Sequence, residues 1–169
     1  MHSDTAAPTG SPPWLVRNYG PRCTLVCAAS VLRKLGARSE RLVEIIERAT
    51  GFKKSGPPAR AYIGWRKSPL DRGIEEAARD GGIRVVSRTR LLVRYRHIVA
   101  SLDRGLPVVL NSYLAPSGLW SHSVLAVGYQ RKGRLILTLD PNDGQFRWMS
   151  WFLPWTGWVC TATYVERTG

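Results

Sequence analysis

The sequence is poor in cysteine and in long apolar runs, and each shortage excludes a class of protein. Three cysteines in 169 residues do not suggest the disulfide framework of a small secreted domain. The longest apolar runs, such as Leu106–Leu110, are far shorter than the roughly 20 residues that cross a bilayer. No basic segment followed by an apolar one opens the chain, so no secretory signal is predicted. These absences favour a cytoplasmic protein without a membrane span.

Acidic residues are also scarce. There are 12 Asp and Glu against 25 Lys and Arg, which gives a formal net charge of +13. A field of this sign attracts polyanions and acidic proteins. The charges are spread from Arg17 to Arg167, however, and no nucleic-acid-binding motif accompanies them. A basic nucleic-acid-binding module is therefore only an alternative. The stretch Lys53–Arg96 is predicted to be either a solvated face or a docking surface for an acidic partner.

Length and composition favour one globular domain. A chain of 169 residues with 44% hydrophobic content can bury a single core, and these figures exclude a disordered or fibrous protein. Residues 1–13 are small, polar and rich in proline, which is typical of a flexible arm. The domain is accordingly placed at residues 14–169.

Helices are predicted in the first two thirds of the chain. Apolar residues fill most positions of the first one and Gly36 follows it, which indicates a buried helix stopped by glycine. Ser39 is the expected N-cap of the second, and Pro69 suits the first turn of the third. Residues 51–67, rich in Gly, Pro and basic residues, are predicted to form a loop. The predicted helices are Cys23–Leu35, Ser39–Arg48, Ser68–Asp80 and Leu91–Leu102.

After Gly105 the sequence changes to short apolar runs separated by turn residues, which is typical of strands. Asp140-Pro141 ends one run because proline cannot donate a hydrogen bond to a neighbouring strand. The predicted strands are Ile83–Val86, Pro107–Leu110, Ser123–Tyr129, Arg134–Leu139, Arg147–Ser150 and Trp158–Tyr164. Helices first and an antiparallel sheet last define the segregated α+β class.

Three residues are placed unusually for purely structural roles. Cys23 stands at the predicted start of a buried helix, where the helix dipole and free backbone N–H groups favour a thiolate. His122 opens a predicted strand and Asp140 ends the next one, so adjacent antiparallel strands would bring the two side chains together. A histidine beside the cysteine can form a thiolate–imidazolium pair. The pattern predicts a Cys–His–Asp thiol centre.

Several segments resemble one family of enzymes. The apolar run from Cys23 to Leu35-Gly36 resembles the nucleophile helix of the bacterial double-glycine leader peptidases and their stand-alone relatives, which are papain-like cysteine peptidases. Further segments match this family in order and spacing, from about Trp14 to Val165. They are Gly105–Leu110, His122–Tyr129, Leu137–Pro141 and Met149–Gly157.

The resemblance implies a papain-like domain, with N-terminal helices that include the nucleophile helix packed on a C-terminal antiparallel sheet. It implies Cys23 as nucleophile, His122 as general base and acid, and Asp140 as the orienting residue. The oxyanion would be held by the backbone N–H of Cys23 and an upstream side chain. The family has a glutamine about six residues before the cysteine. Here Arg17 and Asn18 stand at that place and are the oxyanion candidates.

Other assignments remain open. Cys27 is the rival nucleophile because Cys27–Ser30 echoes a segment of other papain-like enzymes, although it lies one turn inside the helix. Trp120 and Ser121, next to His122, are candidates to line a substrate groove. A zinc site is disfavoured, because Cys-x3-Cys without a second close pair is a poor zinc signature. No metal and no cofactor is predicted.

The leading function is a cysteine peptidase acting on a peptide or amide bond through a thioester. The first alternative is a cysteine acyltransferase that moves an acyl group from a carrier protein to an amine. A second is a catalytically degenerate peptide-binding relative. The expected partners are a peptide or acyl substrate and, on the basic surface, an acidic leader peptide or acyl-carrier protein.

Overall fold

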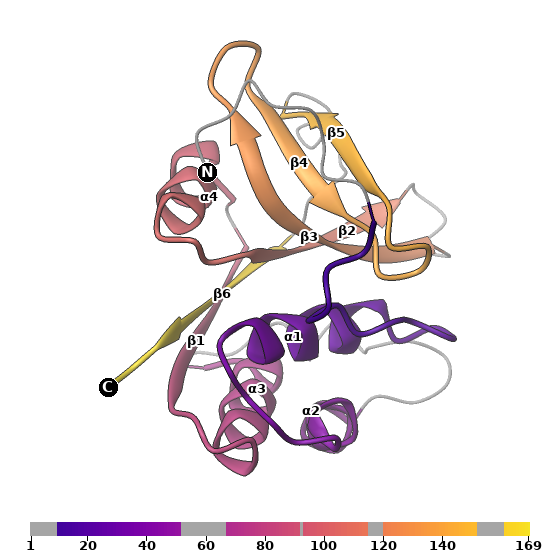
Figure 1. The fold of residues 1–169 in the computed structure, drawn as a ribbon, viewed down its shortest axis with the longest axis vertical. Coiled ribbons are helices and arrows are strands. Elements are labelled where there is room, and N and C mark those ends of the chain that lie inside the picture. Colours follow the sequence, from indigo (N-terminus) through magenta and orange to yellow (C-terminus); the bar gives the residue numbers. More distant parts are fainter. Residues whose placement is uncertain (1–9, 52–66, 92, 115–119, 152–160) are drawn as a thin grey trace.

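The computed structural model describes residues 10–51, 67–91, 93–114, 120–151 and 161–169, of which 112–114, 120 and 121 are described by their backbone alone (Figure 1). Within these residues the chain forms four helices and six strands. The helices are α1 (Cys23–Lys34), α2 (Leu42–Thr50), α3 (Pro69–Asp80) and α4 (Tyr95–Asp103). The strands are β1 (Val85–Arg90), β2 (Val108–Leu114), β3 (Trp120–Gln130), β4 (Leu135–Leu139), β5 (Phe146–Ser150) and β6 (Thr161–Arg167). None of these helices is long and apolar enough to cross a bilayer.

Helix α1 is the centre of the core. Residues 24–32 are all buried, because the helix is covered by the sheet on one side and by α2 and α3 on the other. Gly36, at φ +100°, follows the helix in a conformation that glycine adopts without strain. The predicted helix Cys23–Leu35 is confirmed to within one residue.

The start of α2 differs from the prediction. The helix begins at Leu42, and its N-cap is Arg41 rather than Ser39. The Ser39 hydroxyl instead donates to the carboxylate of Asp80, at the end of α3, and accepts from the Arg41 backbone N–H. The Ser39 hydroxyl therefore accepts from a backbone N–H that precedes α2 and donates to α3, and it does not cap α2.

The start of α3 agrees with the prediction. Ser68 and Asp71 form a reciprocal capping box, and Pro69 occupies the first turn. The box satisfies backbone donors that would otherwise be unpaired at the helix N-terminus.

The six strands form one antiparallel sheet in the order β1-β6-β2-β3-β4-β5. Successive residues of a strand point to opposite faces, so neighbouring residues of β2 and β3 enter different cores. Val109 and Leu125 pack with α1, whereas Val108 and Ala126 pack with α4. Helices α1–α3 therefore cover one face of the sheet and α4 covers the other (Figure 1).

The predicted α+β class is confirmed, with shifts at several boundaries. β1 runs from Val85 to Arg90 rather than over Ile83–Val86, and α4 begins at Tyr95 instead of Leu91. The alternation Ser87-Arg88-Thr89-Arg90 suits an edge strand with one buried and one exposed side. These residues are polar, so they lack the apolar pattern from which strands are predicted. The loop predicted at 51–67 and most of the predicted arm at 1–13 lie outside the described residues.

Candidate active site

Cys23 is the first residue of α1. Its N-cap, Arg22, makes no side-chain capping hydrogen bond, so the thiol stands where the field of the helix favours a negative charge. The side chain is half-buried. This placement follows from the sequence, because Gly20-Pro21 turns the chain immediately before the apolar helix.

His122 and Asp140 are brought together by the β3–β4 pairing. Leu125 of β3 faces Leu139 of β4, which places Asp140, directly after β4, near the start of β3. The Nε2 atom of His122 lies 2.8 Å from Oδ2 of Asp140. The Asn142 backbone N–H donates to the other carboxylate oxygen over 2.9 Å.

The Cys23 thiol and the His122 ring lie close enough to interact, since each shifts the pKa of the other. The three residues predicted from separate stretches of the sequence thus form one chain of contacts, from thiol to imidazole to carboxylate.

These contacts change the pKa of each group. Hydrogen bonds with Asp140 and then with Cys23 raise the pKa of His122 to about 10, although burial opposes the charged ring. Burial alone would raise the pKa of the Cys23 thiol, but hydrogen bonds and the charge of His122 outweigh it and lower the pKa. Burial would raise the pKa of Asp140, but the hydrogen bonds from His122 and from the Asn142 backbone, together with the charge of His122, outweigh it and lower the pKa. The arrangement favours a thiolate beside an imidazolium.

Cys27, the alternative nucleophile, has a different environment. It is fully buried in the core, and its thiol donates to the backbone oxygen of Ser123 at 3.5 Å. Burial raises the pKa of this thiol well above its ordinary value. One helical turn therefore separates a thiol suited to ionise from one that is kept neutral.

The two oxyanion candidates lie on the segment that precedes α1, next to the turn that carries Asp140. The Asn18 backbone N–H donates to the Pro141 carbonyl over 3.0 Å, and its side-chain amide donates to Oδ1 of Asn142 over 2.6 Å. Arg17 is exposed and its guanidinium lies against Gly144, where a Cβ would come within 2.3 Å of it. Gly144 has φ +69°, and this backbone conformation is the reason the turn favours glycine, since the Arg17 guanidinium could move aside.

Trp120 and Ser121 begin β3, where they pair with Leu114 and Tyr113 of β2. Their side chains lie outside the described part of the chain, so their predicted place in a substrate groove stays a prediction.

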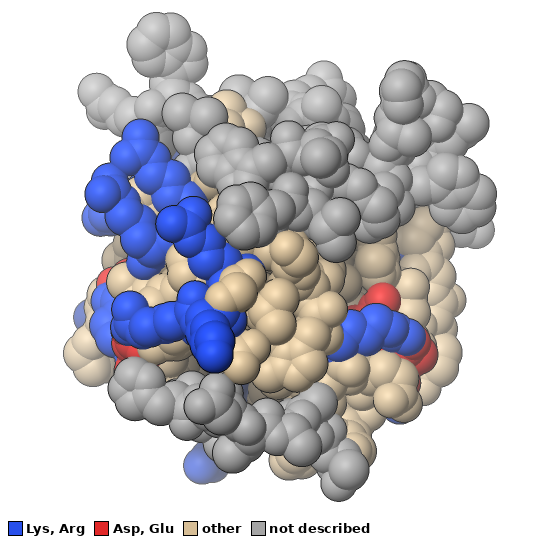
Figure 2. Space-filling view, turned by 90° about the horizontal axis from the view of Figure 1, so that it is seen from above, with Lys and Arg blue, Asp and Glu red and all other residues tan. Residues whose placement is uncertain are grey.

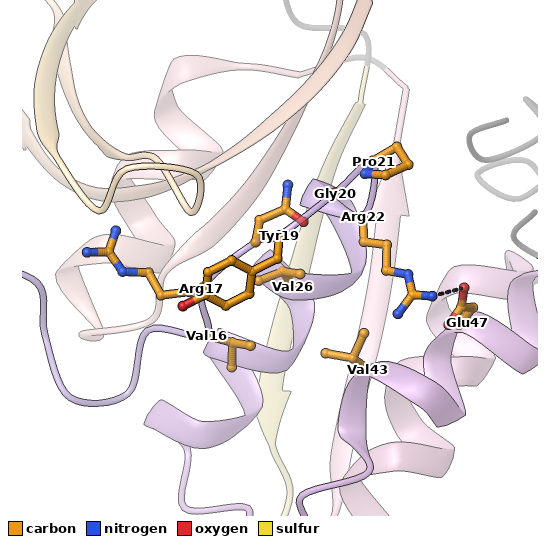
Figure 3. Close-up of a pocket in the computed structure, with 10 residues that line it drawn as sticks. Val16, Arg17, Tyr19, Gly20, Pro21, Arg22, Val26, Val43 and Glu47 are labelled. Carbon is orange, nitrogen blue, oxygen red and sulfur yellow. Dashed lines mark ion pairs between the residues drawn. The ribbon is translucent and has the colours of Figure 1, made fainter. Parts of the chain in front are cut away.

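A cavity of about 590 Å³ opens beside this segment and was not foreseen from the sequence. Val16, Val26 and Val43 contribute its aliphatic lining (Figure 3). Arg22 extends to one side, where it pairs with Glu47 of α2 at 3.2 Å, and Arg17 extends to the other. Because Arg22 directly precedes Cys23, the cavity adjoins the thiol along the chain. Val43 comes from a separate helix, so no short stretch of sequence indicates that these valines line one cavity.

A buried polar cluster lies beneath the thiol and was also missed. Ser123, next to His122, has its hydroxyl 2.6 Å from both Oγ1 of Thr24 and Oδ1 of Asn111. The Asn111 amide group donates to Oγ1 of Thr161 over 2.7 Å. All four residues are buried. Thr24 and Ser123 each adjoin a predicted site residue, which is the one signal that the sequence offered.

No group of three or more His, Cys, Asp or Glu side chains is arranged to hold a metal ion in the ranges that the structure describes.

No family model and no curated protein matches this chain, but solved structures resemble it. The peptidase domain of Streptococcus ComA, a bifunctional ABC transporter, gives a TM-score of 0.59 at 19% identity, covering 91% of this chain and 98% of that one. A C39-like peptidase from Bacillus anthracis gives 0.57 at 12% identity, covering 92% and 95%. The peptidase domain of Streptococcus mutans ComA gives 0.50 at 18%, covering 90% and 98%. The chain thus has the papain-like fold of C39 peptidase domains, which confirms the predicted resemblance at the level of the fold.

Proposed function

We propose that this chain is a cysteine peptidase that cleaves a peptide or amide bond through a thioester on Cys23. The observation that supports it most is the continuous contact from the Cys23 thiol through His122 to Asp140, with 2.8 Å between the last two. The fold shared with C39 peptidase domains supports the same class of reaction.

In the proposed cycle, the Cys23 thiolate attacks the substrate carbonyl carbon and forms an oxyanion. When this intermediate collapses, the carbon–nitrogen bond breaks and the His122 imidazolium gives its proton to the leaving amine. Water then attacks the thioester as His122 takes a proton from it. The second intermediate releases a carboxylic acid and the thiolate, which restores the starting pair. Asp140 keeps the ring oriented and stabilises its charge.

The oxyanion is assigned to the backbone N–H of Cys23 and the side chain of Asn18. The Asn18 amide nitrogen carries two hydrogens, and Asn142 uses one of them. Arg17 is not assigned this role, because its guanidinium lies against Gly144.

The aliphatic cavity beside Arg22 is assigned to a side chain of the peptide substrate. An apolar side chain would bury area against Val16, Val26 and Val43, and the Arg22–Glu47 ion pair would border it. Peptides with an apolar residue near the scissile bond are therefore the preferred substrates.

The basic surface is assigned to an acidic partner, either a leader peptide or an acyl-carrier protein. Figure 2 shows Lys and Arg side chains gathered on one side of the face seen from above. Burial lowers the pKa of His97, and the charges of Arg90, Arg94 and Arg96, which lie near this ring, lower it further. The Tyr95 hydroxyl donates to the carbonyl of Gln130 over 2.9 Å, which joins this group to the β3–β4 turn. Binding through such a surface weakens as salt is raised.

An acyltransferase is the second candidate, and the basic surface favours it because acyl-carrier proteins are acidic. It shares the first half of the cycle with the peptidase. The two differ in what resolves the thioester, which is water in one case and an amine in the other.

The test is intact-mass analysis of the protein mixed with an activated acyl thioester, followed by addition of buffer or of an amine. We expect one acyl adduct on Cys23, none on Cys23→Ala, and an unchanged adduct on Cys27→Ala. Release as free acid identifies the peptidase, which is then tested on peptides with apolar residues near the scissile bond. Release only as amide identifies the acyltransferase. A protein that never forms an adduct is a binding protein, and the proposal is then wrong.

A further inference from the structure

The two edges of the sheet differ in what covers them. β1 forms one edge and β5 forms the other (Figure 1). On β1, two backbone N–H groups that face away from the sheet are occupied by carboxylates of α3. The Ser87 N–H donates to Oε1 of Glu75 over 3.0 Å. The Thr89 N–H donates to Oδ2 of Asp71 over 3.1 Å. These contacts prevent a further strand from pairing with β1.

The outward backbone groups of β5 follow from its pairing with β4. The Trp151 N–H, directly after β5, donates to the carbonyl of Arg134, directly before β4, over 2.9 Å. In an antiparallel pair, residues that bond to the neighbouring strand alternate with residues that do not. Counted back from Trp151, the N–H and C=O groups of Trp148 and Phe146 face away from β4. Within the described part of the chain, no residue donates to these groups or accepts from them.

β5 also has little of the protection that edge strands commonly carry, which is charge, proline or a bulge. Its five residues hold one charge, that of Arg147, and this guanidinium is paired with Asp143. The register with β4 runs without a shift over Phe146–Ser150. Trp148, in the middle of the strand, is 36% exposed. The edge of β5 can therefore accept a further strand.

The start of β5 adjoins the candidate active site. Phe146 faces Leu139, which directly precedes Asp140. The Arg147 guanidinium lies 3.8 Å from the Asp140 carboxylate. β5 is two strands away from β3, which carries His122, so about 10 Å separate these strands. About three residues of extended chain cover this distance, and a peptide bound at the site can also lie along β5.

We propose that the outward edge of β5 binds an extended acidic segment of the peptide substrate as a seventh strand, a few residues from the scissile bond. The segment exchanges backbone hydrogen bonds with Phe146 and Trp148, and its side chains pack on the indole of Trp148. The net charge of +13 favours acidic side chains in this segment and disfavours pairing with a second copy of this chain. The inference rests on the proposed function, because it names a further part of the substrate.

The first experiment follows backbone hydrogen exchange by NMR in Cys23→Ala, so that added peptides are not consumed. The probes are short peptides that alternate Glu with Val, Leu or Phe. In the free protein, the Trp148 N–H should exchange rapidly, whereas the Ser87 N–H is already bonded to Glu75 and should be protected. Saturating peptide should slow exchange at Trp148 by about tenfold or more and leave Ser87 unchanged.

Two matched comparisons isolate the backbone contacts. An added strand bonds to β5 through alternate residues, so N-methylation of one alternate set in the peptide should prevent binding and methylation of the other set should not. Trp148→Pro removes an outward N–H, a position where an edge strand tolerates proline. It should weaken binding by about fivefold or more relative to Trp148→Ala, which keeps that N–H. If Trp148→Pro does not fold, the methylated peptides still decide.

Each outcome supports or overturns the inference. Slower exchange at Trp148 with the glutamate peptides, and weaker binding of matched lysine peptides, supports it. It is overturned if no peptide slows this exchange, if lysine peptides bind equally well, or if the two methylated sets bind equally. Protection of Trp148 before any peptide is added overturns it as well, because the edge is then already occupied, by a second copy if the protection grows with protein concentration.

The inference and the proposed function fail separately. The small activated acyl thioester does not need the edge of β5 to reach Cys23. A wild-type protein that forms the acyl adduct while Trp148 stays unprotected by every peptide overturns the inference alone. A protein without the adduct overturns the proposed function, whatever the exchange at Trp148 shows.

Discussion

Two carboxylates of this protein, Asp71 and Asp140, differ in burial and in the groups that donate hydrogen bonds to them. Asp71, at the start of α3, is 3% exposed and accepts from the backbone and hydroxyl groups of Ser68 and Thr89 and from the hydroxyl of Ser87. Asp140, at the end of β4, is 19% exposed and accepts from one backbone N–H and one imidazole.

The difference lies in the partners. All the donors to Asp71 are neutral groups that do not titrate in the ordinary pH range, and together they fill the lone pairs of the carboxylate. It fixes α3 to the edge strand β1 through Ser87 and Thr89. Asp140 has a partner that titrates, and that partner contacts a thiol. A saturated carboxylate therefore supports structure, whereas one that shares a titrating ring supports chemistry.

The largest loss of rate is expected when the imidazole ring of His122 is removed. His122→Ala removes the group that stabilises the thiolate and transfers protons, so acyl transfer to Cys23 should fall by about a thousandfold or more. His97→Ala, on α4, is the matched control and should retain the wild-type rate. The measurement is the rate of adduct formation by intact mass. Equal loss in both variants would mean that His122 acts only through the fold.

Asp140→Asn should produce the next largest effect, about a hundredfold loss of rate, at the lower end of what general acid–base assistance contributes. Asp140 is the leading cause of the raised pKa of His122, so the alkaline limit of the thiolate–imidazolium pair should move from about pH 10 toward the ordinary histidine value. For the same reason, the stability that His122 contributes is complete below about pH 6.5 and is lost as pH rises through about 10. The measurement is the pH profile of Cys23 alkylation, with Asp80→Asn as control. An alkaline limit that does not move would contradict the assignment.

Asp71→Asn should lower the stability of the fold and leave the thiol of Cys23 unaffected, in contrast to the substitutions at the site. An amide nitrogen replaces an oxygen that accepts hydrogen bonds, so buried donors lose their partner and unfolding becomes easier by about 2–4 kcal/mol. The thiol pKa should stay at its wild-type value, because the donors to Asp71 are Ser68, Ser87 and Thr89, none of which belongs to the site. Chemical denaturation measures the first quantity and Cys23 alkylation the second. A variant with normal stability and a shifted thiol pKa would contradict the conclusion that Asp71 supports structure and Asp140 supports chemistry.

The sequence predicted residues that carry local signals. Cys23 was chosen because a turn and an apolar helix follow one another, and His122 and Asp140 because each stands at a strand end. Ser39 carried an equally good local signal, but the assignment was wrong, because α2 begins only at Leu42 and the Ser39 hydroxyl bonds to the Arg41 backbone N–H and to Asp80, 41 residues away. The cluster of Asn111, Ser123 and Thr24 depends on strand register and on how α1 lies on the sheet, which no short stretch of sequence contains.

The smallest expected effect tests how far the site extends. Arg147 of β5 lies 3.8 Å from Asp140 and pairs with Asp143, so it can compete with His122 for the carboxylate. Its side chain is 53% exposed, however, and solvent screens such pairs to about 0–1 kcal/mol. Arg147→Gln should therefore change the rate of Cys23 alkylation at most about threefold, and high salt should remove the difference. Arg33→Gln, which breaks the exposed pair with Glu40, is the control. A tenfold effect that persists in high salt would show that Asp140 depends on Arg147 as closely as on His122, and the two carboxylates would then differ less than their immediate partners indicate.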